Sequence, residues 1–375
     1  MTPPIPASPT RTAPLRVVVW STGTVGRHAI AGIDRHPDLE LVGVWVSNPD
    51  KVGRDAGDLA GLGRDLGVLA TDDRDALLAL RPDCIVHCAM TDDRVFEAID
   101  DLVGFLDAGV NVVSSGPVVL LGRSPALHDD VWDRIETAGA RGDASLHVNG
   151  IDPGWANDVL PLQLTSLSQR IDEVRVMEIA DYSTYYQPVV MRDLFGFGQP
   201  LDAEVLMWMP GVLSMAWGPV VHTIARGLGL TLDEPLRESV DRRPAEQDLL
   251  TASVDIAACT MGAVRFEVAC LVDGVPRVVL EHVTRTHVDQ VPEWPQPPSG
   301  GGCYRVVVTG EPALQLDLTH HGEPRDGELR DHNVSGMIVT AMRLVNSVPA
   351  VVAAERGLVT ALDLPLVTGR GLVAR

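Results

Sequence analysis

The stretch from Leu15 to Ile30 constrains the fold most, because it has the pattern of a strand that turns through glycines into a helix. Residues 17–19 are three consecutive valines, typical of a buried strand, and residues 27–34 are predicted to form a helix. Between them, S-T-G-T-V-G at 21–26 matches the dinucleotide fingerprint G-x-G-x-x-G, with serine in place of the first glycine. An ordinary strand–helix turn that happens to contain glycine has the same pattern.

If the turn binds a dinucleotide, its glycines let the backbone approach the diphosphate, and the helix N-terminus offers free N–H groups to it. The cofactor-binding residues expected in this turn are Ser21, Thr22, Gly23, Thr24, Val25 and Gly26. A second strand predicted at residues 39–46 lies at the distance that a βαβ crossover requires, and therefore favours this interpretation.

The end of the second strand indicates which nucleotide is bound. An Asp or Glu about 20 residues after the glycines usually binds a free ribose 2′-hydroxyl. Here the strand ends in Ser47 and Asn48, followed by Asp50, Lys51 and Arg54. Hydroxyl and amide groups beside a cation accept a 2′-phosphate that a carboxylate would repel. We therefore expect Ser47, Asn48 and Lys51 to bind NADP in preference to NAD, although Asp50 is close and Lys51 is equally explained as a solvated side chain.

Later segments continue the alternation of strands and helices. Strands are predicted at 67–70, 84–90, 110–114 and 145–148, and helices at 74–80, 92–108 and 126–138. Six alternating strands predict an α/β fold with a doubly wound, Rossmann-type parallel sheet over residues 15–165. Two strand ends should lie near the nicotinamide. The residues expected there are Ala89, Met90, Thr91, Ser114 and Gly116, with Thr91 also a candidate N-cap.

The character of the sequence changes after residue 165. Strands predicted at 171–180, 249–258, 263–272, 275–288 and 304–309, with an Asp273-Gly274 turn, indicate an α+β domain with a mostly antiparallel sheet over 166–330. Helices at 333–347 and 350–356 are expected to return to the first domain, within residues 331–375. The proline-rich residues 1–14 are expected to be a disordered tail and not a signal peptide.

Charge and cysteine content exclude several classes of partner. The net charge of −21 argues against binding nucleic acid or an anionic membrane. The apolar stretch 205–230 is broken by Pro210 and Pro219 and is better explained as two buried helices than as a membrane span. Five scattered cysteines without C-x-x-C or zinc spacing suit a reducing compartment, so we expect a cytoplasmic protein without a metal.

Six short motifs along the chain, taken together in their order and spacing, are fairly specific for one protein family. They are V-V-W-S-T-G-T-V-G-R at 18–27, D-K-V-G-R-D-A-G at 50–57, G-V-N-V-V-S-S at 109–115, D-P-G-W at 152–155, R-L-V-N-S-V-P at 343–349 and G-L-V-T-A-L-D-L-P at 357–365. On these the chain resembles the dihydrodipicolinate-reductase-like superfamily, in the branch of 2,4-diaminopentanoate dehydrogenase and the native NAD(P)H-dependent amine dehydrogenases. The resemblance implies hydride transfer from a nicotinamide cofactor to an imine, a homodimer formed through the C-terminal domain, and Asn346 near the cofactor.

One departure from the family concerns the proton-handling group. Amine dehydrogenases of this kind have a glutamate after the fifth strand, where this chain has Pro117 preceded by Gly116. No carboxylate occurs between Asn111 and Ser124, so the role falls elsewhere or is absent. The E-x-H-H motif of true dihydrodipicolinate reductases is missing too, which disfavours that reaction.

The candidate catalytic and substrate residues follow the sixth strand. Tyr182 and His147 are the catalytic candidates, because reduction of a C=N bond needs a group that manages a proton. Asn149, Asp152, Tyr185 and His222 are the candidates for binding substrate. Each has a structural alternative: an aromatic core edge for the tyrosines, a satisfied core histidine for His147 and His222, and a turn cap for Asp152. The Met- and Trp-rich segment 207–217 fits a pocket wall, a dimer seam or plain core.

The sequence thus predicts an amine-dehydrogenase-type oxidoreductase acting on a small carbonyl or amine. Two alternatives stay open. One is a reductase of a preformed imine or carbonyl, which the missing glutamate favours, and the other is a non-catalytic NADP-binding regulatory protein.

Overall fold

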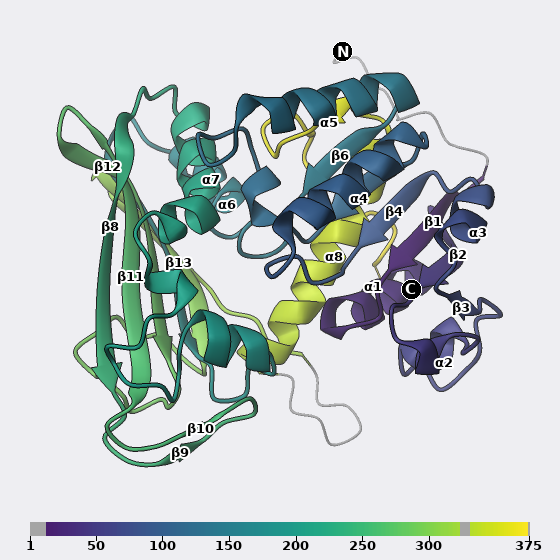
Figure 1. Ribbon diagram of the computed structural model, residues 1–375. Helices are drawn as coiled ribbons and strands as arrows, with labels where there is room; N and C mark the ends of the chain where they lie inside the picture. The colour runs from purple at the N-terminus through teal and green to yellow at the C-terminus, as the bar shows by residue number, and fades with distance from the viewer. Residues whose placement is uncertain (1–12, 323–330, 374–375) are drawn as a thin grey trace.

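The computed structural model describes residues 13–322 and 331–373. Its two large sheets lie side by side (Figure 1), and a third sheet has only two short strands. Nearly all of the tail predicted at residues 1–14 lies outside the described residues. The N-terminal sheet has seven strands in the order β15-β6-β5-β4-β1-β2-β3, all parallel. The α/β fold with a doubly wound parallel sheet is confirmed.

The elements of this first domain alternate along the chain as the sequence predicts. They are β1 Leu15–Trp20, α1 Thr24–Arg35, β2 Leu39–Trp45, η1 Pro49–Lys51, α2 Ala56–Leu59, β3 Ala70–Thr71, α3 Arg74–Ala79, β4 Cys84–His87, α4 Val95–Asp107, β5 Asn111–Ser114, η2 Val118–Leu120, α5 Asp129–Gly142 and β6 Ser145–Val148. The last strand, β15 Gly357–Leu358, comes from the C-terminal end of the chain.

The valine run of β1 is buried on both faces because helices cover both sides of the sheet. Val17 and Val19 pack in one cluster with α1 and the long helix α8 (His332–Val352). Val18 packs in another cluster, with α3, α4 and α5. Gly32 lets α8 lie close to α1, since a Cβ there would fall 2.2 Å from Met342 Cε.

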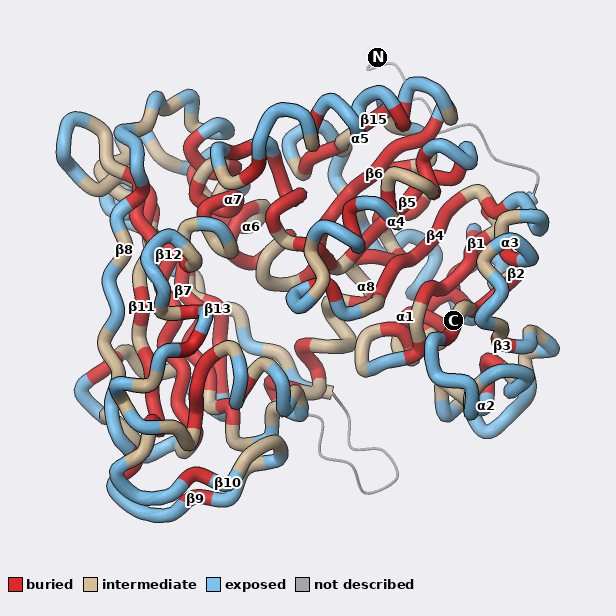
Figure 2. The backbone as a smooth tube through the Cα atoms, viewed as in Figure 1, coloured by how far each residue is buried: buried red, intermediate tan, exposed pale blue. Residues whose placement is uncertain are grey.

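The second domain is a six-stranded sheet in the order β14-β13-β7-β12-β11-β8. Neighbouring strands in this sheet are antiparallel, except for the parallel pair β7 and β12. Its elements are α6 Val159–Thr165, β7 Arg170–Asp181, η3 Val190–Leu194, η4 Leu206–Trp208, α7 Val212–Gly227, β8 Asp233–Pro244, β11 Met261–Val272, β12 Val275–Arg285, β13 Gly302–Glu311 and β14 Leu314–Leu318. Helices α6 and α7 pack on this sheet, and Figure 2 shows buried residues along β7, β11, β12 and β13.

Four element predictions are wrong. The strand predicted at 249–258 is a hairpin of β9 Leu249–Leu250 and β10 Asp255–Ile256, because Thr251 Oγ1 accepts hydrogen bonds from two following backbone N–H groups and the chain reverses. Helix α4 begins at Val95, so Thr91 is not its N-cap. The two helices predicted at 333–347 and 350–356 are the single helix α8, which contains Pro349. The two helices predicted in the stretch 205–230 are η4 and α7, but α7 runs through Pro219, where a second break was predicted.

Among the described residues, α8 is the one helix whose length and apolar composition would suit a membrane span. It packs against α1, β4 and β5, and 44% of its apolar window is buried. Packing within the protein therefore accounts for its composition. Its first residues lie at the junction of the two sheets, beside the cavities described next.

Candidate active site

The glycine turn between β1 and α1 has the backbone of a dinucleotide-binding motif. Ser21 has φ of +87°, the left-handed conformation that glycine adopts easily and serine does not. A Cβ on Gly26 would lie 2.0 Å from the Ser21 carbonyl oxygen, so only glycine fits there. Gly23 is the N-cap of α1 and supplies no side-chain cap, and a Cβ on it would meet nothing nearer than 3.9 Å. The start of α1 therefore has no side-chain cap, and there is free space beside Gly23.

A cavity of about 440 Å³ adjoins this turn and fits the diphosphate of a dinucleotide. Thr22, Gly23, Thr24 and Arg27 line it, and the first turn of α1 contains no acidic residue. An anion placed there would meet free backbone donors and the positive end of the helix dipole. Val25 is partly buried and packs against the core of the sheet.

The residues predicted to select the nucleotide lie at the edge of the same turn. Lys51 Nζ is 3.1 Å from Thr22 Oγ1 and 3.3 Å from the Thr22 carbonyl oxygen. Ser47 and Asn48 are exposed, and the Asn48 side chain accepts a hydrogen bond from Asp50 N. Lys51 therefore places a cation beside the glycine turn, with hydroxyl and amide groups near it.

A strap formed by residues 182–187 of the second domain crosses to the glycine turn. Gln187 Nε2 donates to Thr24 Oγ1 at 3.0 Å. Asn333, at the start of α8, donates to the Asp181 carbonyl oxygen at 2.8 Å and to Thr184 Oγ1 at 2.7 Å, which fixes the other end of the strap. The sequence analysis did not single out Gln187 or Asn333.

A second cavity, of about 280 Å³, lies between the strap, the face of the second sheet and the ends of β5 and β6. Most of its wall is apolar. The apolar residues are Val95, Val118, Val119, Ile151, Val190, Leu194, Phe195, Leu206, Met207, Val212, Met215, Ala216, Trp217 and Met337. Pro117, where the resemblance described above implies a glutamate, is also in this wall. The segment 207–217 thus contributes residues to a pocket wall.

The polar end of this cavity is a row of side chains across three strands. Tyr304 of β13 and His282 of β12 both pair directly with Glu178 of β7 in the sheet register. His282 Nδ1 lies 3.0 Å from Glu178 Oε2, which also accepts a hydrogen bond from the Tyr182 hydroxyl at 2.9 Å. Tyr304 donates to Glu178 Oε1 over a longer 3.4 Å.

Asp152 completes the row from the turn after β6. Its Oδ2 lies 3.3 Å from His282 Nε2 and accepts a hydrogen bond from Asn157 Nδ2 at 2.8 Å. The His282 ring stacks on Phe266, at 4.9 Å between centroids, and meets Trp217 edge-on at 5.1 Å. His282 is therefore held between two carboxylates and two aromatic rings, with 4% of its side chain exposed.

These contacts set the protonation of the three groups. Burial by itself would lower the pKa of His282, but Asp152 and Glu178 raise it to about 10. Burial works against ionisation of Glu178, yet its hydrogen bond and charge interaction with His282 keep its pKa below the ordinary value. For Asp152 burial prevails, and its pKa is raised. At neutral pH the row thus contains an imidazolium beside an ionised Glu178.

Ligand atoms of Asp152, Glu178 and His282 lie within 4.8 Å of one another, close enough to suggest a metal site. The two carboxylates, however, contact opposite nitrogens of the imidazole ring. Asp152 and Glu178 raise the pKa of His282 to about 10, and a protonated imidazole has no lone pair to offer a metal ion. The geometry therefore favours an imidazolium between two carboxylates over a metal centre.

The structure brings only some of the predicted catalytic and substrate residues to this cavity. Asp152, Tyr182 and Tyr185 line it, and the two tyrosine rings stack at 4.5 Å. His147 does not reach it, because its Nδ1 contacts the Val359 carbonyl oxygen at 2.8 Å beside β15, and burial lowers its pKa to about 4. The prediction of a catalytic His147 is thus not supported by its position.

Two predicted substrate residues are also absent from the cavity wall. Asn149 donates to Ser347 Oγ at 3.2 Å, a contact that joins β6 to α8. His222 lies on α7, with Nε2 3.4 Å from Glu234. Both are better explained as structural contacts between elements.

The residues predicted near the nicotinamide have different surroundings. Ser114 is fully buried and its hydroxyl contacts His87 Nδ1 at 2.9 Å, so it is occupied within the sheet. Thr91 and Gly116 bring the ends of β4 and β5 together, since a Cβ on Gly116 would lie 2.3 Å from Thr91 Oγ1. Of the other predicted contacts, Ala89 is half-buried, Met90 is exposed, and Asn346 has a buried side-chain oxygen without a hydrogen-bond partner in the described structure.

The main polar groups of the cavity, Glu178, His282 and Tyr304, were not predicted from the sequence. A signal for two of them exists. Glu178 is in phase with Val174 and Val176 along β7, and His282 is in phase with Val278 and Leu280 along β12. A charged or titratable residue in phase with the buried valines of a strand lies on the buried face.

Comparisons with known proteins find relatives over almost the whole chain. Residues 155–372 match the family described as 2,4-diaminopentanoate dehydrogenase C-terminal domain. The chain is 44% identical to an amine dehydrogenase of Streptomyces virginiae, over 96% of this chain and 99% of that one. It is 22% identical to 2,4-diaminopentanoate dehydrogenase of Acetoanaerobium sticklandii, over 94% of each. Its fold is similar to that of an amine dehydrogenase from Mycobacterium smegmatis, with a TM-score of 0.73, 23% identity and coverage of 95% and 98%.

Proposed function

Because this chain belongs to the family of amine dehydrogenases and 2,4-diaminopentanoate dehydrogenases, we propose that it interconverts a small apolar ketone or aldehyde, with ammonia, and the corresponding amine. Members of this family are NAD(P)-dependent oxidoreductases that act on a CH–NH₂ bond. The nicotinamide cofactor supplies or accepts the hydride when bound. The residues of this chain bind and orient the carbonyl or imine, exclude water from it, and handle its protons.

The lining of the 280 Å³ cavity carries the proposal for the substrate class. Among the described residues no lysine or arginine lines it, and its one cationic group, His282, is already flanked by two carboxylates. A substrate carboxylate would lose its hydration there without gaining a counter-ion, which is costly. Keto acids and dicarboxylates are therefore poor substrates, and neutral apolar carbonyl compounds are good ones.

We propose NADP as the preferred cofactor. The position of Lys51 beside Thr22 supports this, as does the pair Ser47 and Asn48 at the end of β2, where NAD-dependent enzymes usually have a carboxylate. A 2′-phosphate near Lys51 would gain a charge-assisted contact.

A second candidate function is the reduction of a preformed imine without ammonia, favoured by Pro117 in the cavity wall. Asp152 and Glu178 line the same cavity, however, and supply carboxylates that the loop after β5 lacks. This observation favours the use of ammonia.

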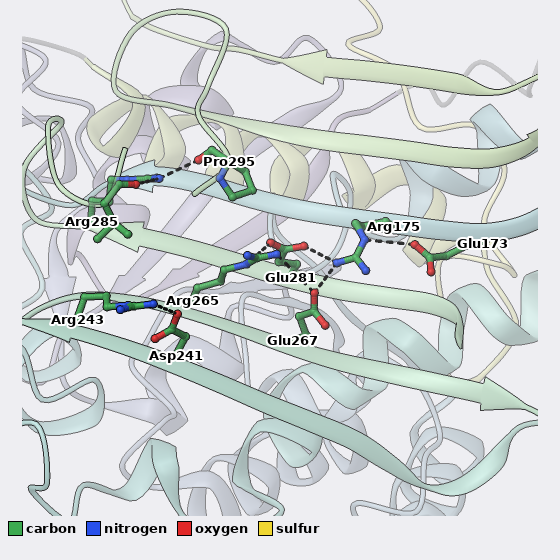
Figure 3. Close-up of polar contacts among 10 residues, drawn as sticks. Glu173, Arg175, Asp241, Arg243, Arg265, Glu267, Glu281, Arg285 and Pro295 are labelled. Atoms are coloured by element: carbon green, nitrogen blue, oxygen red, sulfur yellow. Dashed lines mark hydrogen bonds and ion pairs between the residues drawn. The ribbon is translucent and has the colours of Figure 1, made fainter. Parts of the chain in front are cut away.

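We also propose that the protein is a cytoplasmic homodimer formed through the second sheet. The sheet face opposite the cavity carries a network of arginines and glutamates (Figure 3). Arg175 bonds Glu267 at 2.6 Å and also pairs with Glu281, which Arg265 contacts at 2.7 Å. The Glu281 side chain is only 1% exposed within this chain, whereas Arg175 and Arg265 are 26% and 35% exposed and can contact a second surface. Four of the five cysteines are buried and all five are unpaired, which suits a reducing compartment.

The substrate class is tested by measuring NADPH oxidation in ammonium buffer. Cyclohexanone and pyruvate are compared as neutral and anionic substrates. We expect turnover with the neutral ketone and at least tenfold lower kcat/KM with the keto acid, as an uncompensated buried charge implies. Equal turnover of the two would contradict the proposed substrate class.

A further inference from the structure

The polar end of the substrate cavity contains two hydrogen-bond acceptors that the protein leaves underused. Asp152 Oδ1 is buried, has no hydrogen-bond partner among the described residues, and belongs to a side chain that is 2% exposed. Within residues 13–322 and 331–373, the hydrogen bond found for Glu178 Oε1 is the 3.4 Å contact with the Tyr304 hydroxyl. A carboxylate oxygen can accept two hydrogen bonds, so both atoms have room for a donor.

These two acceptors select the chemistry of their ligand. Both carboxylates line the cavity, one on each side of His282, so a group placed between them must donate N–H or O–H bonds in two directions. A carbonyl oxygen or a substrate carboxylate offers only acceptors and would be repelled. Ammonium and a protonated imine offer several N–H donors together with a positive charge, and satisfy both acceptors.

The charge of the cluster favours the same ligand. Two carboxylates and one imidazolium carry a net negative charge once Asp152 ionises, and a cation bound beside Asp152 favours that ionisation against the burial that raises its pKa. The neighbouring groups do not cancel it: burial lowers the pKa of His332 and raises that of Asp92 and of the tyrosines. The other titratable groups that line the cavity are Asp92, Tyr182, Tyr185, Tyr304 and His332.

We propose that Glu178 and Asp152 form the binding site of the substrate nitrogen, and that Glu178 takes over the proton transfer for which this chain has no glutamate after β5. This inference rests on the proposed function. His282 is a positioning residue, since it holds the two carboxylates apart and keeps Glu178 ionised.

The proton balance closes at Glu178. The Glu178 carboxylate takes one proton from ammonium, and the ammonia that remains forms a C–N bond to the carbonyl carbon while the carbonyl π pair moves to oxygen. A proton passes from nitrogen to that oxygen, giving a carbinolamine. The nitrogen lone pair then forms the C=N bond as the C–O bond breaks, and Glu178 returns its proton to the departing hydroxide. Ammonium and ketone have become iminium and water, and the protein is unchanged.

The test compares two reactions in E178Q. General acid–base groups contribute about 10²- to 10⁴-fold to a rate, so kcat with cyclohexanone and ammonium should fall by at least about 100-fold. With the preformed cyclic imine 2-methyl-1-pyrroline the proton transfer from ammonium is bypassed, and kcat should fall by less than about threefold while KM rises. The matched control is Glu173→Gln, on the same strand but with its side chain in the charged network of the opposite face, and it should change neither kcat. An equal loss in both reactions, or no loss in either, overturns the assignment.

A binding measurement without cofactor separates this inference from the proposed function. By calorimetry, the cofactor-free protein should bind cyclohexylamine at least about tenfold more tightly than cyclohexanol, because only the amine carries a charge-assisted donor. E178Q should lose this preference. If E178Q does not fold, Asp152→Asn, on a turn outside the sheet, gives the same comparison. A wild type without the preference overturns the nitrogen site even if the enzyme is active. A preference that depends on Glu178 in a protein without dehydrogenase activity supports the site and contradicts the proposed function.

Discussion

Glu178 and His282 face each other on the adjacent parallel strands β7 and β12, with Oε2 and Nδ1 3.0 Å apart at the polar end of an otherwise apolar cavity. Cross-strand neighbours on one face of a sheet lie close together, so the register alone places the two side chains in contact. The pair joins the fold of the second domain to the chemistry proposed for the cavity.

The charged state of His282 predicts a pH-dependent contribution to stability. Its pKa is raised by Asp152 and Glu178, so its stabilising effect is full below the unfolded value of 6.5 and is lost as the pH rises towards about 10. We expect the difference in urea midpoint between wild type and H282Q to be constant near pH 6 and to narrow steadily up to pH 10. The midpoints can be followed by tryptophan fluorescence. A difference that stays constant over this range would show that His282 is not an imidazolium in the folded protein.

Replacing Ser21 by glycine is expected to stabilise the protein. The φ of +87° at Ser21 costs a non-glycine residue on the order of 1–3 kcal/mol, part of which S21G regains against the greater freedom of glycine in the unfolded chain. We expect S21G to raise the free energy of unfolding by about 0.5–1 kcal/mol and to preserve NADPH affinity, since glycine is the usual residue of the motif. Ser47→Gly, at an exposed position with ordinary φ, is the control and should not stabilise. Destabilisation by S21G would mean that the serine hydroxyl has a structural role.

Lys51 is expected to make the protein bind NADPH more tightly than NADH. Replacing Lys51 by glutamate puts a negative charge where a 2′-phosphate is proposed to bind, so K51E should raise the Kd of NADPH by at least about tenfold and change that of NADH by less than about threefold. Arg54→Ala removes a nearby cation that is paired with Asp58 at 2.7 Å, and should affect both cofactors little. Fluorescence titration measures the Kd of NADPH and of NADH for the wild type and for both variants. Equal weakening of both cofactors by K51E would contradict the proposed preference for NADP.

The hydrogen bond of Gln187 is expected to slow the dissociation of NADPH, because it holds the strap against the glycine turn. This hydrogen bond to Thr24 is worth about 0.5–1.5 kcal/mol, so Q187A should speed dissociation of NADPH by roughly 2- to 10-fold. Gln199→Ala is the matched control, because it removes a hydrogen bond to the Arg192 carbonyl oxygen outside the cofactor cavity. Stopped-flow displacement measures the rate. If dissociation from Q187A is as slow as from the wild type, the strap does not retain the cofactor.

The first domain could be predicted from the sequence because its signals are local. The valine run, the glycine turn and the following helix are contiguous, and each buried strand of the parallel sheet is a short apolar run. Three strands, β8, β14 and β15, were missed, and they lack such signals. Strand β14 (Leu314–Leu318) is a short edge strand with no fully buried residue. Strand β8 is a charged edge strand with most residues exposed, and β15 consists of two residues that join β6 from more than 200 positions away.

The candidate site could be predicted only in part, for a related reason. Asp152, Tyr182 and Tyr185 follow strand ends in the sequence, where binding residues often occur. Glu178, His282 and Tyr304 come from three strands spread over more than 120 residues, and only the sheet register brings them into one row. His147 follows the same strand-end logic as Asp152, yet the addition of β15 buries it.

Transfer of the hydride to an imine can be tested directly with deuterium. The enzyme is incubated with cyclohexanone, ammonium and NADPH carrying deuterium at C4 of the nicotinamide, and the products are analysed by mass spectrometry. The account predicts cyclohexylamine with deuterium on the carbon that bears nitrogen, formed only when ammonium is present. Deuterated cyclohexanol as the sole product, at a rate independent of ammonium, would contradict it.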